Sequence, residues 1–133
     1  MMPHKHFIVS TIFVVLIVWL FFPSLSYAQI GIWILIAGLF AILVDMDSAF
    51  LLYASKDKKL KPFRNYFYLN SHFNQFMKLI SDNGIMKTAL RTHIIFSAIC
   101  IAIAYLFIHT YLIPITIGVL SHLLSDIPNL RYL

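Results

Sequence analysis

The clearest chemical spacing in this chain is that of His122 and Asp126, which lie four positions apart near its end. Residues at i and i+4 share one face of a helix about one turn apart, so both side chains can face the same point. Imidazole and carboxylate groups both bind divalent cations, and such a pair is half of a usable metal site. The alternative is an aspartate that only hydrogen-bonds the histidine at a helix end, and the pair taken alone favours it.

A pair of acidic residues, Asp45 and Asp47, follows an uninterrupted apolar stretch. Positions i and i+2 point to different faces of a helix, so both carboxylates reach one ion only if the helix is locally irregular. Otherwise one binds the ion and the other orients a ligand. An aspartate inside a membrane span costs about 2.5–3.5 kcal/mol on insertion scales, so the pair requires a partner. A metal ion is the favoured partner, and Lys56 is the alternative.

Two histidines stand at the beginnings of other apolar stretches. His6 precedes the first stretch, and His93 precedes the third. Either one alone is typical of an ordinary histidine at a membrane interface. His4 is a substitute for His6 that lies further from the helix, whereas His72 and His109 are expected to be ordinary polar residues.

Four apolar stretches must position these side chains. Their uninterrupted parts are 13 to 16 residues long, below the roughly 20 residues needed to cross a bilayer. Each stretch therefore needs its polar end to complete the crossing. The sequence predicts an all-α integral membrane four-helix bundle of two helical hairpins. This is a single domain over residues 1–133, with spans at about 7–22, 30–55, 93–108 and 112–126.

The linker between the second and third spans, residues 56–92, has the pattern of a membrane-surface segment. It opens with a charge run from Lys56 to Pro62. Apolar residues then recur at helical spacing, which predicts an amphipathic helix in the cytoplasmic interface. The turn residues Asp82-Asn83-Gly84 should end that helix. The apolar positions are Leu69, Phe73, Phe76, Met77 and Ile80.

The basic residues predict the orientation of the chain. All ten lysines and arginines fall in residues 5, 56–91 and 131, on one side of the predicted spans. The opposite turns, 23–29 and 109–111, contain no lysine, arginine or acidic residue. Since lysine and arginine collect on cytoplasmic loops, we expect a multi-pass protein of the cell membrane with both termini cytoplasmic.

The composition agrees with this class of protein. The chain is 61% hydrophobic and 11% charged, with a formal net charge of +5. The topology explains the positive charge, because basic residues lie against anionic lipid at the cytoplasmic leaflet. Membrane lipid is therefore the expected partner, nucleic acid is not, and a homo-oligomer is left open.

The first stretch also has features of a signal peptide. A basic start and an apolar core are followed by Ser26-Tyr27-Ala28, which is typical of a cleavage site. Cleavage after Ala28 would remove His6 and the first span. The apolar core is at the upper length for a signal peptide, so a retained helix is the favoured interpretation.

The predicted topology brings the chemistry-bearing residues to one end of the bundle. Independent placement would scatter them between the two membrane faces, whereas all four helices present a histidine or aspartate at the cytoplasmic end. We therefore expect a shared divalent metal site. Asp47 is either a ligand or the general base that takes a proton from metal-bound water, and Arg91 either steadies an anionic substrate or only sets topology. The expected ligands are His6, Asp45, His93, His122 and Asp126.

These motifs resemble those of the YdjM-like membrane-bound metal-dependent hydrolases. The resemblance is carried, in order, by His6, Asp45-Met46-Asp47, Thr92-His93 and the segment Ser121-His122-Leu123-Leu124-Ser125-Asp126. The chain departs from the family pattern at Ser48 and Thr88, where the family has histidines. The resemblance implies a hydrolase that uses a divalent ion such as zinc, manganese or iron.

The location of the site favours an amphiphilic substrate, such as a lipid-like ester or phosphoester. Two other functions stay open. One is a metal-ion or proton transporter, which is disfavoured because no acid or histidine lies mid-span to continue a pathway. The other is a non-catalytic membrane scaffold whose polar groups only tie helices together.

Overall fold

The computed structural model describes residues 3–127, without the side chains of Pro3 and Asp47. Within this range the secondary structure is entirely helical, which confirms the predicted all-α class. The helices are α1 (Pro3–Phe21), α2 (Tyr27–Leu43), α3 (Met46–Ala54), η1 (Lys58–Arg64), α4 (Tyr66–Ser71), α5 (Phe73–Asp82), α6 (Ile85–Phe107), η2 (His109–Tyr111) and α7 (Leu112–Asp126).

Three helical segments are long and apolar enough to cross a membrane, which indicates a membrane protein. They are His4–Phe21, Tyr27–Ala54 and Ile85–Phe107, of 18, 28 and 23 residues. Their outward faces carry large exposed apolar side chains, such as Trp19, Leu35 and Ile103. An extensive exposed apolar surface of this kind is typical of contact with lipid. The 15-residue α7 is shorter than these three, so the predicted fourth span is not among them.

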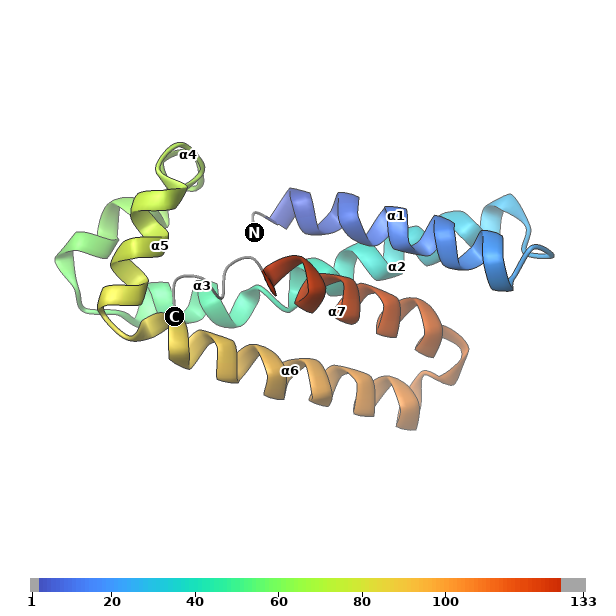
Figure 1. The fold of residues 1–133 in the computed structure, drawn as a ribbon. Helices are drawn as coiled ribbons and strands as arrows, with labels where there is room; N and C mark the ends of the chain where they lie inside the picture. Colours follow the sequence, from blue (N-terminus) through green and yellow to red (C-terminus); the bar gives the residue numbers. More distant parts are fainter. Residues whose placement is uncertain (1–2, 128–133) are drawn as a thin grey trace.

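Helix α7 lies at the centre of the molecule and packs against α1, α2 and α6 (Figure 1). Small residues allow this close packing, as they do between helices in membranes. A Cβ atom at Gly118 would collide with the backbone of Ala37 on α2, and one at Gly38 would collide with the ring of Phe7. The central position of α7 carries His122 into the interior of the protein, where its side chain is 0% exposed.

The second apolar segment is interrupted at Val44–Asp45. Helix α2 ends at Leu43 and α3 begins at Met46, with Asp45 as its N-cap residue. The Asp45 N–H donates to the carbonyl of Ile42 at 3.0 Å, which is the tighter i to i−3 pattern. The second span is therefore locally irregular at this point, which is the condition under which the sequence would allow Asp45 and Asp47 to reach one ion. The sequence has no proline or glycine there, so the interruption had no local signal.

The linker residues form a small core of their own. The predicted amphipathic face is confirmed, with Met77 and Ile80 buried against Leu52, Leu60 and Phe63. The helix is divided in two, because α4 ends at Ser71 and α5 begins at Phe73. As predicted, Asp82-Asn83-Gly84 ends α5, and Gly84 adopts a φ of 69°, a left-handed conformation that suits glycine. This apolar face packs on α3 and the start of α6.

One end of the molecule collects the polar elements (Figure 1). The start of α1, the whole α3–α5 region, the start of α6 and the end of α7 lie there. These elements and their connections hold every lysine and arginine of the described residues, from Lys5 to Arg91. The candidate functional residues lie at the same end, on α1, α3, α6 and α7.

Candidate metal centre

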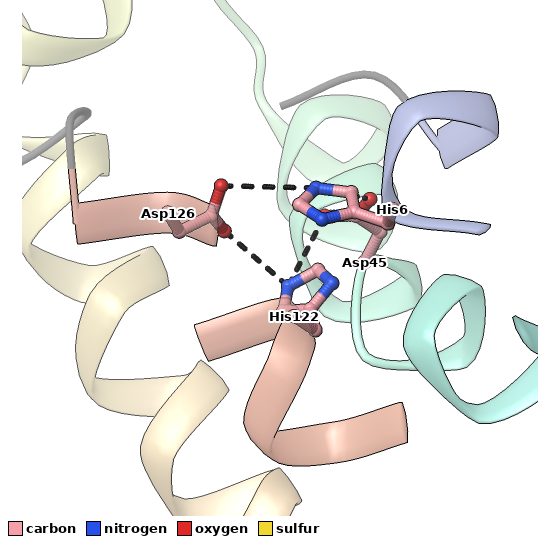
Figure 2. Close-up of side chains that lie close together, drawn as sticks. All are labelled: His6, Asp45, His122 and Asp126. Carbon is pink, nitrogen blue, oxygen red and sulfur yellow. Dashed lines mark ion pairs between the residues drawn. The ribbon is translucent and has the colours of Figure 1, made fainter. Parts of the chain in front are cut away.

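Three histidines and two aspartates meet where the ends of the long helices come together. His6 comes from α1, Asp45 from the interruption before α3, His93 from α6, and His122 and Asp126 from α7. Figure 2 shows four of these side chains pointing toward one another. Each of these four, all except His93, offers one ligand atom within 4.8 Å of the other three. The imidazole rings of His6 and His122 are both 0% exposed.

The carboxylate of Asp45 faces all three imidazole rings. His6 Nε2 lies 3.5 Å from its Oδ2, while His93 Nε2 and His122 Nε2 lie 3.6 and 3.7 Å from its Oδ1. In each ring it is Nε2, the outer nitrogen, that faces the carboxylate. The Asp45 carboxylate therefore lies next to the Nε2 atom of all three histidines.

The carboxylate of Asp126 faces the same three nitrogens from another side. Its Oδ2 lies 3.3 Å from His122 Nε2 and 3.9 Å from His93 Nε2, and its Oδ1 lies 3.7 Å from His6 Nε2. The His122–Asp126 pair thus has the shared helix face that its spacing predicts. Five side chains from four separate segments therefore surround one small volume. His93 is one of them, because its Nε2 faces the carboxylates of both Asp45 and Asp126.

These separations are longer than hydrogen bonds and close to those expected between ligands of a common ion, with three of the six longer by 0.1–0.3 Å. N–H···O bonds in proteins are about 2.7–3.2 Å long, and the six distances here are 3.3–3.9 Å. Two ligand atoms that each lie about 2.1 Å from one ion are about 3.0–3.6 Å apart when they subtend 90–120° at it. A cation of ordinary size in the middle therefore fits the arrangement better than direct hydrogen bonding does.

Unsatisfied buried atoms point the same way. Among the described residues, neither ring nitrogen of His122 has a hydrogen-bond partner, and neither does Oδ2 of Asp45. Leaving buried polar atoms without partners costs about 1–3 kcal/mol each. A metal ion would satisfy Nε2 of His122 and the Asp45 oxygen together. The residues present thus fit a bound cation.

Ser125 sets the tautomer of His6. The Ser125 hydroxyl donates its single proton to the carbonyl of His122 at 2.8 Å, and its Oγ lies 2.7 Å from His6 Nδ1. With its proton committed, the hydroxyl accepts from His6 Nδ1–H. A neutral His6 then has its lone pair on Nε2, and a cation between this nitrogen and the two carboxylates it faces would bind all three groups. Such a hydrogen bond from the ring nitrogen that faces away from the ion is typical of metal-ligating histidines.

Replacing Ser125 by alanine is expected to weaken metal binding about tenfold, the lower end of the range for such supporting groups. The change removes the acceptor for His6 Nδ1–H and leaves the ring free to rotate or to change tautomer. The measurement is the dissociation constant of the purified protein for zinc. Ser71→Ala is the control, since Ser71 Oγ donates to a backbone carbonyl at 3.0 Å in the same way, on α4. Equal affinities of the two variants would show that Ser125 does not position His6.

Ring packing also holds the histidines in place. The His6 and His122 ring centroids lie 4.0 Å apart with the planes tilted by 32°. The ring centroid of His93 lies 5.3 Å from that of His122. On α1, the hydroxyls of Ser10 and Thr11 both donate to the Phe7 carbonyl at 2.9 Å, within the turn that follows His6.

The structure brings all five predicted ligands together, and it places the other candidates as follows. Asp47 lies on α3, but its side chain is outside the described part of the chain, so its role as general base stays a prediction. Arg91 is exposed on α6, two positions before His93, and its role in substrate binding also stays a prediction. Lys56, the alternative partner of the aspartates, is exposed beyond the end of α3.

The remaining histidines lie away from the site. His4 Nδ1 lies 2.7 Å from the hydroxyl of Tyr66, so His4 does not substitute for His6 here. His72 stacks on Tyr68, and His109 packs edge-on against Tyr105. Ser125 is the functional residue that sequence reasoning missed, although its position three residues after His122 placed it on the correct stretch of helix.

The chain matches no protein-family model, no curated protein and no solved structure.

Proposed function

We propose that this protein is a membrane-embedded, metal-dependent hydrolase whose site lies at the cytoplasmic membrane interface. The observation that carries the proposal is the convergence of three imidazole Nε2 atoms on two carboxylates, at 3.3–3.9 Å. We assign the ion to His6, Asp45, His93, His122 and Asp126.

The donor set favours a transition metal. Three imidazole nitrogens suit zinc or iron, and the two carboxylates also suit manganese, whereas calcium and magnesium prefer sites built wholly from oxygen. Two carboxylates balance the charge of one divalent ion, so the buried site is neutral when it is loaded. Such neutrality favours binding in a region of low dielectric, because burying an uncompensated charge is costly.

A bound ion with one open position would lower the pKa of its water towards neutrality and supply a nucleophile at neutral pH. The protein's own residues hold the ligands, exclude bulk water and move the proton. Asp47, two residues after the ligand Asp45, is our candidate for the base that receives this proton. Arg91 is our candidate for contact with an anionic substrate group.

We also propose the finer topology. Helix α7 is enclosed by α1, α2 and α6, so it can complete a four-helix bundle although it is short. The basic residues at the site's end of the molecule favour the cytoplasm for that end and for both termini. This topology places the site beside the lipid headgroups of the cell membrane, and membrane lipid is then the natural partner.

The resemblance to YdjM-like hydrolases agrees with this proposal, because the residues of its motifs supply the five assigned ligands. One departure has a clear place in the structure. Ser48, where the family has a histidine, lines a cavity beside the site. Thr88, the other departure, is exposed on α6.

The Asp47→Asn variant tests the hydrolase function. We expect it to keep its metal and to lose at least about 100-fold in turnover, the usual contribution of a general base. The measurement is cleavage of nitrophenyl esters and phosphoesters by zinc-, manganese- and iron-loaded protein in detergent. Asp82→Asn is the matched control, an exposed aspartate at the end of α5.

A transporter would behave differently in the same preparation. Metal uptake into proteoliposomes without ester cleavage by any loaded form would contradict a hydrolase and support the transporter. A scaffold would bind no metal at all. The ring nitrogens of His122 argue against a scaffold, because both are buried without a hydrogen-bond partner in the described part of the chain, whereas polar groups that only tie helices together would be paired.

A further inference from the structure

A cavity of about 300 Å³ opens directly beside the metal centre. Three of the five assigned ligands, Asp45, His93 and Asp126, line one part of it. The rest of its wall comes from α3, η1, α4, α5 and the first turns of α6. It therefore lies between the long helices and the linker region that separates them in sequence, and it is partly open to the outside.

The wall away from the ligands is almost wholly apolar. It includes the buried residues of the linker core, whose side chains are at most 8% exposed. A cavity with apolar walls and a few polar groups at one place is the usual form of a small-molecule site, and its volume is at the low end of the usual range of about 300–1,000 Å³. The apolar residues are Leu52, Leu60, Phe63, Met77 and Ile80.

The charged residue in this wall is already engaged. Arg64 Nη2 donates to the carbonyls of Tyr53 and Ser55, both at 3.0 Å, and so holds η1 against the end of α3. Its guanidinium also lies over the Tyr53 ring, 5.5 Å from the centroid. Arg64 therefore holds part of the cavity wall in place through Nη2, while its Nε is buried without a hydrogen-bond partner among the described residues. The metal centre, with two carboxylates and an imidazole in the wall, is the larger polar group there.

We infer that this cavity holds the single aliphatic chain of the substrate, while the substrate's oxyanion or ester head lies at the metal. The inference rests on the proposed function and specifies its substrate class, a one-chain amphiphile. Two observations carry it: the ligands share the cavity wall, and the remaining wall matches a hydrocarbon chain and little else. The small volume favours one chain over two.

The linker core then has a specific role. Its amphipathic helices cover the cavity instead of lying free, so the apolar face of α5 recognises the chain. A short-chain or chainless molecule with the same head should bind the metal but gain nothing from the cavity. This difference separates a lipid-like ligand from free phosphate, which offers the same head chemistry.

Ala49 offers a way to block the cavity without replacing a ligand, and its contact with Asp45 is through the backbone, from its N–H to the Asp45 carbonyl at 3.1 Å. It lies on α3, is exposed, and lines the cavity. Ala54, on the same helix, is also exposed but does not line the cavity. Ala49→Phe should fill the space meant for the chain, and Ala54→Phe makes the same substitution outside it, at the last residue of α3. Ala49→Glu beside Ala54→Glu is a second pair that uses charge in place of bulk.

The test uses cobalt(II)-loaded protein in detergent, because the visible spectrum of cobalt reports on groups that bind to the ion. Decyl phosphate and inorganic phosphate are titrated against wild type and the four variants. We expect decyl phosphate to change the wild-type spectrum at concentrations at least tenfold lower than inorganic phosphate does. The Ala54 variants should behave as wild type, and the Ala49 variants should lose this tenfold preference while their response to inorganic phosphate is kept.

Detergent micelles concentrate decyl phosphate equally for every variant, so the comparison between variants isolates the cavity. An equal preference in the Ala49 and Ala54 pairs would overturn the inference and leave the metal centre standing. Absence of a cobalt spectrum in wild type would instead overturn the proposed function, and the inference with it. The two failures are therefore distinct.

Discussion

Replacing Asp45 by asparagine is expected to lower the affinity of the protein for its metal ion by at least about 100-fold, beyond the usual effect of losing a supporting group. All three imidazole Nε2 atoms lie 3.5–3.7 Å from this carboxylate. Asparagine has nearly the same shape but no charge, so the loaded site would carry an uncompensated positive charge. The measurement is the zinc dissociation constant by competition with a chromogenic chelator.

Asp82→Asn serves as the control, because it removes one carboxylate from an exposed position at the end of α5. Its affinity should equal that of wild type. The unfolding temperature gives a second readout, since asparagine is cheaper to bury than a charged aspartate. A stable Asp45→Asn protein with unchanged zinc affinity would show that Asp45 does not bind the ion.

Removing the ion from the wild-type protein is expected to lower its stability substantially. A ligand that binds only the folded state stabilises it by about 4 kcal/mol when it is present at a thousand times its dissociation constant. Two carboxylates and three imidazoles that face one another without a cation add repulsion and unsatisfied groups. We expect the unfolding temperature in detergent to fall by several degrees on chelation and to recover on adding zinc, manganese or iron.

The Asp45→Asn variant is the reference for this experiment. Its unfolding temperature should be the same with chelator, with added metal and with neither, because it has little affinity for the ion. The unfolding temperature of the wild-type protein should be lower with chelator than with added metal. Chelation that shifts both proteins equally would mean that the chelator acts on something other than this site.

The cluster of candidate ligands was predictable because it depends on topology more than on fine geometry. Apolar runs of known length and the one-sided distribution of lysine and arginine are enough to bring His6, Asp45, His93 and Asp126 to one end of the molecule. Helical periodicity alone puts His122 and Asp126 on one face. The turn at Asp82-Asn83-Gly84 was likewise predictable, because a positive φ suits glycine.

Other features depend on contacts that no local pattern encodes. The interruption at Val44–Asp45 has no proline or glycine to announce it. Ser125 looks like any polar residue on a helix until the fold brings His6, 119 positions away, against it. The cavity arises only because the linker helices fold back over α3 and α6, which hydrophobic periodicity does not specify.

The central claim is that these five side chains hold a divalent metal ion, and metal content tests it most directly. The measurement is elemental mass spectrometry of detergent-purified wild type and of His122→Ala/Asp126→Ala, each after reconstitution with zinc, manganese and iron and removal of excess ion. We predict about one ion per chain in the wild type, by the balance of two carboxylates with one divalent charge, and almost none in the double variant. No retained metal in the wild type with any of the three ions would contradict the claim, and so would equal retention by the double variant.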